Sequence, residues 1–249
     1  MSEAASRRGL LIPALTTIVI ITALLALGVW QLERRTEKLA LISTLEERLA
    51  AAPVALPPAA RWSELTPASD EFRRVTLTGA IDNRAPAQVF ASSSPLRKDV
   101  SGTGVWTFAP VKLAGGETVV VNRGFVGDGQ TATPPDTSPV RLAGYIRFPE
   151  APGWLTPAAD RNKRLWFVRD HVSMAQALGW AEPARLAPFY IDLEGPAPAG
   201  GVPKPGPLQV NLKNDHLQYA VTWFLLAGAV LIAFGFWLRG QRRGSTASL

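Results

Sequence analysis

The sequence predicts two transmembrane α-helices that flank a mainly antiparallel β domain, barrel-like or sandwich-like, with one or two short helices. Two long uncharged apolar segments lie near the chain ends, and alternating apolar residues punctuated by Gly and Pro lie between them. The 249 residues are 47% hydrophobic and only 18% charged. Such a composition is typical of a folded chain in contact with lipid.

The first apolar segment, residues 10–30, contains no charge and is rich in Leu, Ile and Val. As a helix it is long enough to cross a hydrocarbon core of about 30 Å. The segment is longer than the apolar region of a signal peptide, and no small-x-small cleavage site follows it. We therefore expect an uncleaved membrane anchor.

The second apolar segment, residues 219–238, ends in Phe236-Trp237-Leu238 directly before Arg239. An interfacial aromatic residue followed by a charge is typical of the end of a membrane span. A buried core helix is the weaker interpretation.

The net charge of +6 is concentrated in the two tails, residues 1–9 and 239–249, which together hold +4 of it. Basic residues outside both spans predict that both termini are cytoplasmic. Residues 31–218 would then form an extracytoplasmic domain. Because only nine residues precede the first span, a bacterial inner membrane with a periplasmic domain is the simplest expectation. The charges elsewhere nearly cancel, so membrane lipid, and not nucleic acid, is the expected partner.

Residues 31–52 predict a helical extension of the first span. An apolar stripe recurs there at helical spacing, and Pro53 and Pro57-Pro58 end the pattern. The stripe consists of Leu32, Leu39, Ile42, Leu45 and Leu49.

Residues 72–194 predict the β domain, with one short helix at 172–178. No interval offers regular crossover helices, so antiparallel pairing is expected. Residues 195–207, rich in Pro and Gly, predict a linker back to the membrane. Gly102-Thr103-Gly104 is interpreted as a turn. The expected strands are 72–79, 105–111, 118–122, 140–147, 165–169 and 189–193.

Most enzyme chemistry is not supported by the sequence. The chain has no Cys, which excludes disulfides and zinc–thiolate sites, and it lacks the common nucleophile, phosphate-loop and zinc-protease motifs. Asp170-His171 is interpreted as a helix-capping pair; a periplasmic hydrolase that uses His171 is the alternative. Arg161, Lys163 and Arg164 predict a solvated loop, or else a partner surface. We expect that the protein is not an enzyme.

The most informative residues lie at the extracytoplasmic ends of the two predicted spans. Antiparallel spans would bring the end of the first helix level with the start of the second, where aromatic residues are ordinary interfacial anchors. The imidazole of His216 is less expected: it either snorkels or caps the helix, or it binds haem iron. Arg34 and Lys38 would then face haem propionates. The candidate haem-binding residues are His216, Trp223, Tyr219, Trp30, Gln31 and Arg34.

Five sequence blocks resemble the surfeit-locus family of cytochrome c oxidase assembly factors, and the resemblance covers nearly the whole chain. Blocks at both membrane boundaries and within the β domain occur in the family order. They are GVWQLERRTEK at 28–38, VNRGFV at 121–126, GYIR at 144–147, WFVRDHVSMA at 166–175 and NDHLQYAVTW at 214–223.

The resemblance implies an inner-membrane assembly factor that assists the delivery of haem a to subunit one of a haem–copper oxidase. Contact with the enzymes that make haem a or haem o is a second expectation. His216 matches the position proposed as the haem ligand in bacterial members, and Trp223 is the matching aromatic residue. The alternative is a structural scaffold or permanent accessory subunit of a terminal oxidase, without haem of its own. For residues 122–124 a structural role is favoured, with Gly124 in a left-handed turn and Arg123 bonded to loop carbonyls.

Overall fold

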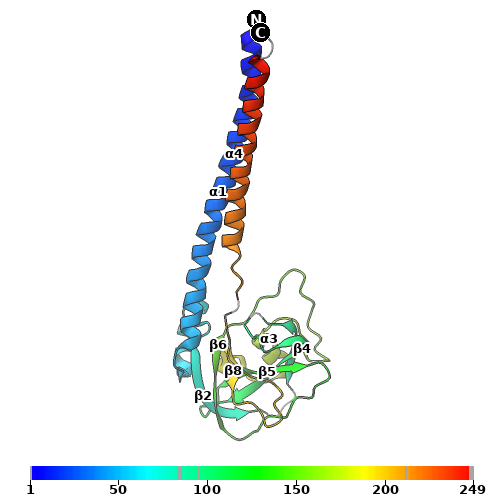
Figure 1. Cartoon of the computed structure of the whole chain (residues 1–249). Helices are drawn as coiled ribbons and strands as arrows, with labels where there is room; N and C mark the ends of the chain where they lie inside the picture. The colour runs from blue at the N-terminus through cyan, green and yellow to red at the C-terminus, as the bar shows by residue number, and fades with distance from the viewer. Residues whose placement is uncertain (1, 83–85, 95, 211, 247–249) are drawn as a thin grey trace. The chain divides into compact units, whose positions relative to one another are not determined.

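The computed structural model describes residues 2–82, 86–94, 96–210 and 212–246. The chain forms two units (Figure 1). One contains Met1–Ser43 and Leu212–Leu249, and the other contains Thr44–Asn211.

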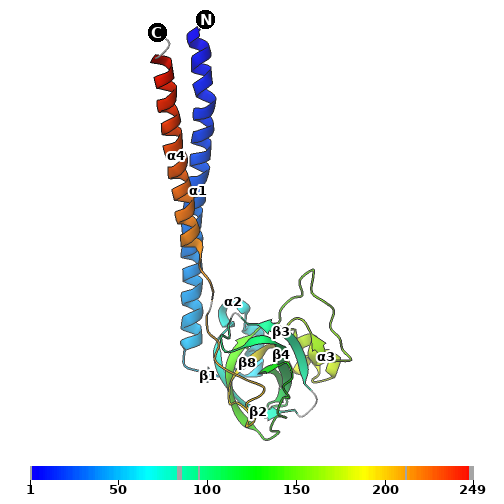
Figure 2. The same ribbon diagram turned by 45° about the vertical axis from the view of Figure 1, so that its right-hand side comes forward.

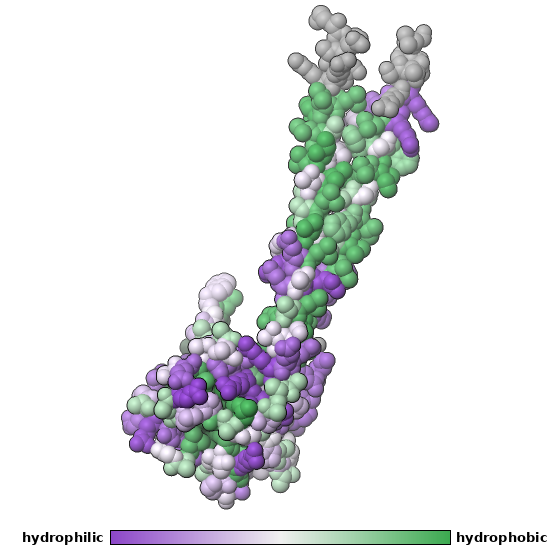
Figure 3. Space-filling view, turned by 90° about the vertical axis from the view of Figure 1, so that its left-hand side faces the viewer, coloured by the Kyte–Doolittle hydropathy of each residue, from purple (hydrophilic) through white to green (hydrophobic). Residues whose placement is uncertain are grey.

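The first unit is a helix pair built from α1 (Ser2–Ala50) and α4 (His216–Thr246). α1 continues without a break through the predicted extension and leaves the first unit after Ser43. The two helices run antiparallel and lie side by side in both ribbon views (Figures 1 and 2). Each contains a segment that is long and apolar enough to cross a membrane, and apolar residues cover most of the visible surface of the pair (Figure 3).

Among the less exposed residues of each helix, one series recurs at alternating spacings of three and four residues. This heptad pattern is the signature of two helices packed along a seam. We call these residues the helix seam. On α1 they are Ala14, Thr17, Ile21, Leu24, Gly28 and Gln31, and on α4 they are His216, Ala220, Trp223, Ala227, Val230, Phe234 and Trp237.

The second unit contains an eight-stranded sheet and few helices. The strands are β1 (Val54–Ala55), β2 (Arg74–Ile81), β3 (Ala87–Ser93), β4 (Ser101–Lys112), β5 (Thr118–Gly127), β6 (Val140–Arg147), β7 (Leu165–Trp166) and β8 (Leu186–Gly195). The helices are α2 (Pro67–Asp70) and α3 (His171–Leu178), with short 3₁₀ turns at Ala59–Glu64 and Pro183–Arg185.

Five strands of this sheet close into a ring. The order runs β2-β6-β8-β5-β4, and Ala80 and Ile81 of β2 pair back onto Lys112 and Val111 of β4. Of the two architectures that the sequence predicts, barrel and sandwich, this closed ring is the barrel. The sheet is mixed, because β5 and β8 are parallel, as are β1–β2 and β3–β7. A long connection through β6, β7 and α3 lets β8 return parallel to β5 without a dedicated crossover helix.

Several local predictions need correction. Gly102–Gly104 belongs to β4 and is not a turn, because Gly104 pairs with Gly127 while its missing Cβ leaves room for the carbonyl oxygen of Val126. β3 was not predicted, because its Ala- and Ser-rich sequence has weak strand propensity. Antiparallel pairing with β4 holds this segment in the extended conformation. β5 extends five residues beyond its predicted end at Asn122, and β7 is shorter than predicted.

The core of this unit forms two apolar clusters on opposite faces of the sheet. Val119 and Val121 of β5 belong to one cluster, and Val120 to the other, because successive strand residues point to opposite faces. α3 contributes Met174 and Ala175 to the second cluster. Because both faces are covered, nine of the ten β5 residues are buried.

Candidate functional site

The candidate site lies where α4 begins beside α1. The Nδ1 atom of His216 lies 2.7 Å from Oε1 of Gln31. Since an amide oxygen can only accept a hydrogen bond, Nδ1 carries the proton and donates it. In the neutral ring, the lone pair is then on Nε2. The two residues that sequence reasoning placed level with each other are in direct contact.

Small residues bring the helices close beside this hydrogen bond. Gly28 is buried, and a Cβ atom built there would lie 2.4 Å from the Phe224 ring. Ala220 and Ala227 on α4 are only 1% and 4% exposed. Close approach through Gly and Ala is a usual way for membrane helices to pack. This close packing explains how His216 and Gln31, on different helices, come within hydrogen-bonding distance.

The other predicted site residues occupy different positions around this contact. Trp223 lies in the helix seam, and its Nε1 atom is buried without a hydrogen-bond partner among the described residues. Trp30 and Tyr219 lie outside the seam, 49% and 56% exposed. Arg34 forms an ion pair of 2.7 Å with Glu37 on the same helix. Tyr219 therefore does not continue the stripe of His216; Ala220 does.

The donor set fits an axial ligand to a porphyrin iron better than a multi-ligand metal site. No cluster of three or more His, Cys, Asp or Glu side chains occurs within the residues that the structure describes. His216 offers one imidazole nitrogen, and its other ring N–H is held by Gln31. A second hydrogen bond of this kind is what fixes the orientation and tautomer of metal-binding histidines.

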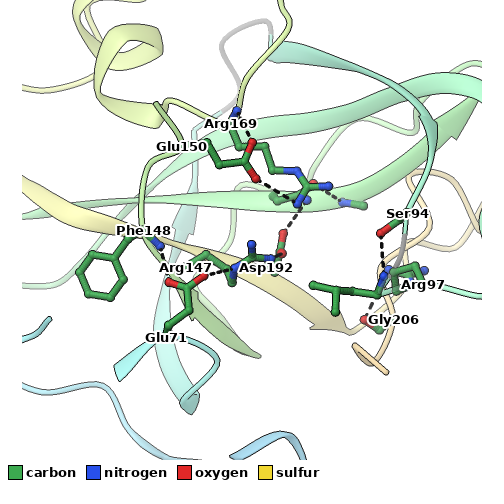
Figure 4. Close-up of polar contacts among 12 residues, drawn as sticks. Glu71, Ser94, Arg97, Arg147, Phe148, Glu150, Arg169, Asp192 and Gly206 are labelled. Carbon is green, nitrogen blue, oxygen red and sulfur yellow. Dashed lines mark hydrogen bonds and ion pairs between the residues drawn. The ribbon is translucent and has the colours of Figure 1, made fainter. Parts of the chain in front are cut away.

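The β domain contains a second polar cluster, a buried network around Arg147 of β6 (Figure 4). Arg147 donates to Glu71 at 2.6 Å and to Asp192 of β8 at 3.0 Å. Asn122 of β5 donates to the other Asp192 oxygen at 2.6 Å. Burial works against the charged form of Arg147, but the acidic groups of Tyr190, Asp192 and Glu71 outweigh it and raise its pKa. We call Glu71, Asn122, Arg147 and Asp192 the ring network.

The sequence blocks at 121–126 and 144–147 meet in the ring network. The Asn122 side chain also accepts from the backbone N–H of Gly124 at 3.1 Å, and Arg123 donates to the Thr133 carbonyl at 2.8 Å. Gly124 has φ +125° within β5, and a Cβ there would lie 2.3 Å from the Lys204 carbonyl carbon. The structural interpretation of these residues is confirmed, although Gly124 lies in a strand and not in a turn.

Two further arginines flank the face of Trp106 next to this network. The guanidinium carbons of Arg97 and Arg169 lie 5.8 Å and 5.3 Å from the centre of its ring. Arg97 pairs with Asp99 at 2.7 Å, and Arg169 lies 3.6 Å from Glu150. Sequence reasoning missed Glu71, Arg97 and Asp192. The one available signal was Asp192, an acidic residue inside the apolar strand FYIDL.

His171 is fully buried at the start of α3. Its Nε2 atom lies 3.0 Å from the Ala187 carbonyl oxygen, and burial lowers its pKa. Asp170 caps the helix by accepting from the backbone N–H of Ser173 at 3.2 Å. The capping interpretation is confirmed, and the ring offers no exposed nitrogen for the hydrolase alternative.

Comparisons with known proteins agree with the motifs. The family model described as "SURF1 family" matches residues 18–228. A "SURF1-like protein" of Monosiga brevicollis is 29% identical over all of this chain and 94% of its own length. "Surfeit locus protein 1" of Homo sapiens is 32% identical over 86% of this chain and 74% of its own. A "SURF1-like protein" of Drosophila melanogaster is 34% identical over 88% of this chain and 73% of its own.

Proposed function

Because the chain belongs to the SURF1 family, the cytochrome c oxidase assembly family, we propose that it assists the delivery of haem a to subunit one of a haem–copper oxidase. The observation that carries the haem part of the proposal is the hydrogen bond between His216 and Gln31. It leaves Nε2 of an oriented imidazole as a ligand for iron.

Five of the six candidate residues have a task in this proposal, and Tyr219 has none. His216 binds the iron, and Gln31 holds its ring. Trp223 and Trp30 offer apolar surface to the macrocycle, and Arg34 offers a cation to a propionate after exchanging its partner Glu37. Haem supplies the iron that the imidazole binds; it is cargo to be passed on. A single axial ligand favours exchange over permanent retention.

The proposal includes a location. Both termini lie in the bacterial cytoplasm and residues 31–218 in the periplasm, so that the His216–Gln31 contact lies near the outer membrane boundary. The support is the basic character of both tails. Reaction of single introduced cysteines in the two tails and at Thr137 with an impermeant thiol reagent would test it, since the chain has no cysteine of its own.

The experiment for haem binding is a visible spectrum with pyridine haemochrome quantitation of the detergent-purified chain, co-expressed with haem a synthesis. We expect a Soret band near one haem per chain for the wild type and for Leu217→Ala, the matched neighbour on α4. His216→Ala should lose the band and remain folded. Gln31→Ala should bind about 10–100-fold more weakly, as loss of an orienting partner does.

A scaffold or accessory subunit without haem is the second candidate. One observation favours it: His216 is the only His in the helix pair. In a strain that lacks the protein, this candidate predicts that His216→Ala restores the mature oxidase as well as the wild type does. Equal haem content in wild type and His216→Ala would contradict the haem part alone. Unchanged oxidase levels in the deletion strain would contradict the assembly role itself.

A further inference from the structure

The segment between β6 and β7, residues 148–164, projects from the rest of the β domain (Figures 1 and 2). It contains the most exposed large apolar side chains of that domain among the described residues. Trp154 is 93% exposed and Leu155 is 73% exposed. Side chains of this size at such exposure usually mark a contact surface when they occur together.

Hydrogen bonds fix the tip of this segment as a tight turn. The Gly153 carbonyl accepts from the backbone N–H of Thr156 at 3.1 Å, and the Gly153 N–H donates to Thr156 Oγ1 at 2.9 Å. Trp154 and Leu155 are therefore the two central residues of a β-turn. At the base, the Glu150 N–H donates to the Arg169 carbonyl at 3.3 Å. The two apolar side chains are presented by a built turn.

The apolar surface continues behind the turn. A hollow of about 590 Å³ lies there, lined by Phe90, Phe167 and Pro157 together with the turn itself. Phe90 is 45% exposed, and its ring centre lies 6.2 Å from that of Phe167.

A second turn in the same segment presents positive charge. Backbone hydrogen bonds join Asp160 and Leu165 in both directions, at 2.8 Å and 2.9 Å. The residues between them include Arg161, Lys163 and Arg164, all exposed. Lys163 makes a loose ion pair of 3.7 Å with Asp160, and its side chain is 79% exposed. The segment thus displays an apolar turn and a basic turn.

We propose that residues 148–164 dock the β domain onto the surface of an anionic phospholipid membrane. Trp and Leu would insert at the headgroup level while the basic turn binds lipid phosphates. Both ends of the β domain continue into helices able to span a bilayer, so lipid is present at high effective concentration. This combination of aromatic, aliphatic and basic residues matches a bilayer interface. The inference does not depend on haem binding.

The test uses the full chain in lipid nanodiscs, and the absence of native cysteine makes single labelling simple. A fluorophore sensitive to polarity is attached to Leu155→Cys, with Thr137→Cys on the exposed β5–β6 loop as the matched control. In discs of phosphatidylcholine and phosphatidylglycerol at about 7:3, we expect blue-shifted emission and quenching by doxyl lipid at position 155 only. Replacing Arg161, Lys163 and Arg164 together by Glu should reduce the quenching several-fold.

Three outcomes would overturn the proposal. The first is equal and weak quenching at positions 155 and 137. The second is quenching at 155 that the triple Glu variant and high salt leave unchanged, because it would remove the role of the basic turn. The third is a probe that remains in water in lipid discs and becomes shielded only when purified oxidase is added, which would assign the segment to a protein partner.

Discussion

The ring network and the helix seam differ in how completely their polar side chains are hydrogen-bonded. In the ring network, both Asp192 oxygens and both Glu71 oxygens accept hydrogen bonds from within the domain. In the helix seam, His216 uses one ring nitrogen for Gln31, and the buried Trp223 Nε1 has no partner among the described residues. The four carboxylate oxygens of the first arrangement are all hydrogen-bonded and stabilise the fold; in the second, one imidazole nitrogen and one indole N–H have no partner among the described residues.

This difference shows that a sequence motif does not by itself indicate a ligand site. The block at 121–126 and the block at 214–223 are both among the five blocks that resemble the family. The structure distinguishes them, because the Asn122 amide and the Arg123 guanidinium of the first block are hydrogen-bonded within their own domain.

The largest effect is expected from Arg147→Met, which leaves the buried Asp192 and the partly buried Glu71 without their cation. Breaking a buried pair in this way costs about 3–5 kcal/mol of unfolding free energy, measured by denaturant unfolding of the full chain in detergent. The matched control is Arg61→Met. Arg61 pairs with Glu64 at 2.9 Å on the surface, with both side chains more than half exposed, and its loss should cost less than about 1 kcal/mol. Similar losses in the two variants would refute the structural role of the network.

Gly124→Ala should come next, because it adds a clash to an unfavourable backbone conformation. A positive φ costs a residue with a Cβ about 1–3 kcal/mol, and the new Cβ would displace the Lys204 backbone that exchanges hydrogen bonds of 3.1 Å and 2.8 Å with Phe125. Gly102→Ala is the control, since Gly102 has φ +81° and nothing within 4 Å of its built Cβ. Equal unfolding free energies for the two variants would contradict the close approach.

Gly28→Leu should weaken the helix seam without unfolding the β domain. The added side chain meets the Phe224 ring, which we expect to separate Gln31 from His216. In a Gln31→Cys/His216→Cys background, oxidative crosslinking should slow several-fold. Gly228→Leu, where a built Cβ meets nothing within 4 Å, should leave the rate unchanged. Unaltered crosslinking in Gly28→Leu would show that the seam tolerates bulk at this position.

Apolar segments and periodicity in the sequence were sufficient to predict both long helices. The predicted end of α1, residue 52, lies two residues beyond the observed end at Ala50, and both ends of β6 were predicted correctly. Those elements depend on local pattern. β3 and the ring closure depend on partners distant in the chain: β3 pairs with β4, and Ala80 of β2 pairs with Lys112. No local property of AQVFASS indicates that partner, and a parallel pairing such as β5–β8 leaves no mark in either strand.

The candidate site was predictable to a similar degree. His216 was identified because an imidazole is less expected at the end of an apolar span, and Gln31 because antiparallel spans bring the end of the first helix level with the start of the second. The exposure of Tyr219 was not predictable, since a difference of one residue on a helix rotates a side chain by about 100° out of the seam. The ion pair of Arg34 with Glu37 was not predicted, although opposite charges three residues apart on a helix are neighbours.

The smallest effect is expected at Asp99, whose partly exposed side chain forms an ion pair with Arg97. Its hydrogen bond with Arg97, aided by Lys204, holds the pKa of the Asp99 carboxyl well below its usual value. A carboxyl with a lowered pKa stabilises the fold at pH values above its unfolded pKa of about 4. This stabilisation decreases as pH falls below that value, because the unfolded chain then binds more protons.

Asp99→Asn should therefore flatten the decrease in unfolding free energy between about pH 4.5 and 2.5. Asp99 is 42% exposed, so solvent screening keeps the difference below about 1 kcal/mol. Asp136→Asn is the control, since that exposed carboxyl accepts a backbone hydrogen bond from Ser138 and forms no ion pair within the part of the chain that the structure describes. A pH profile changed equally by both variants would mean that the Arg97 ion pair contributes nothing of its own.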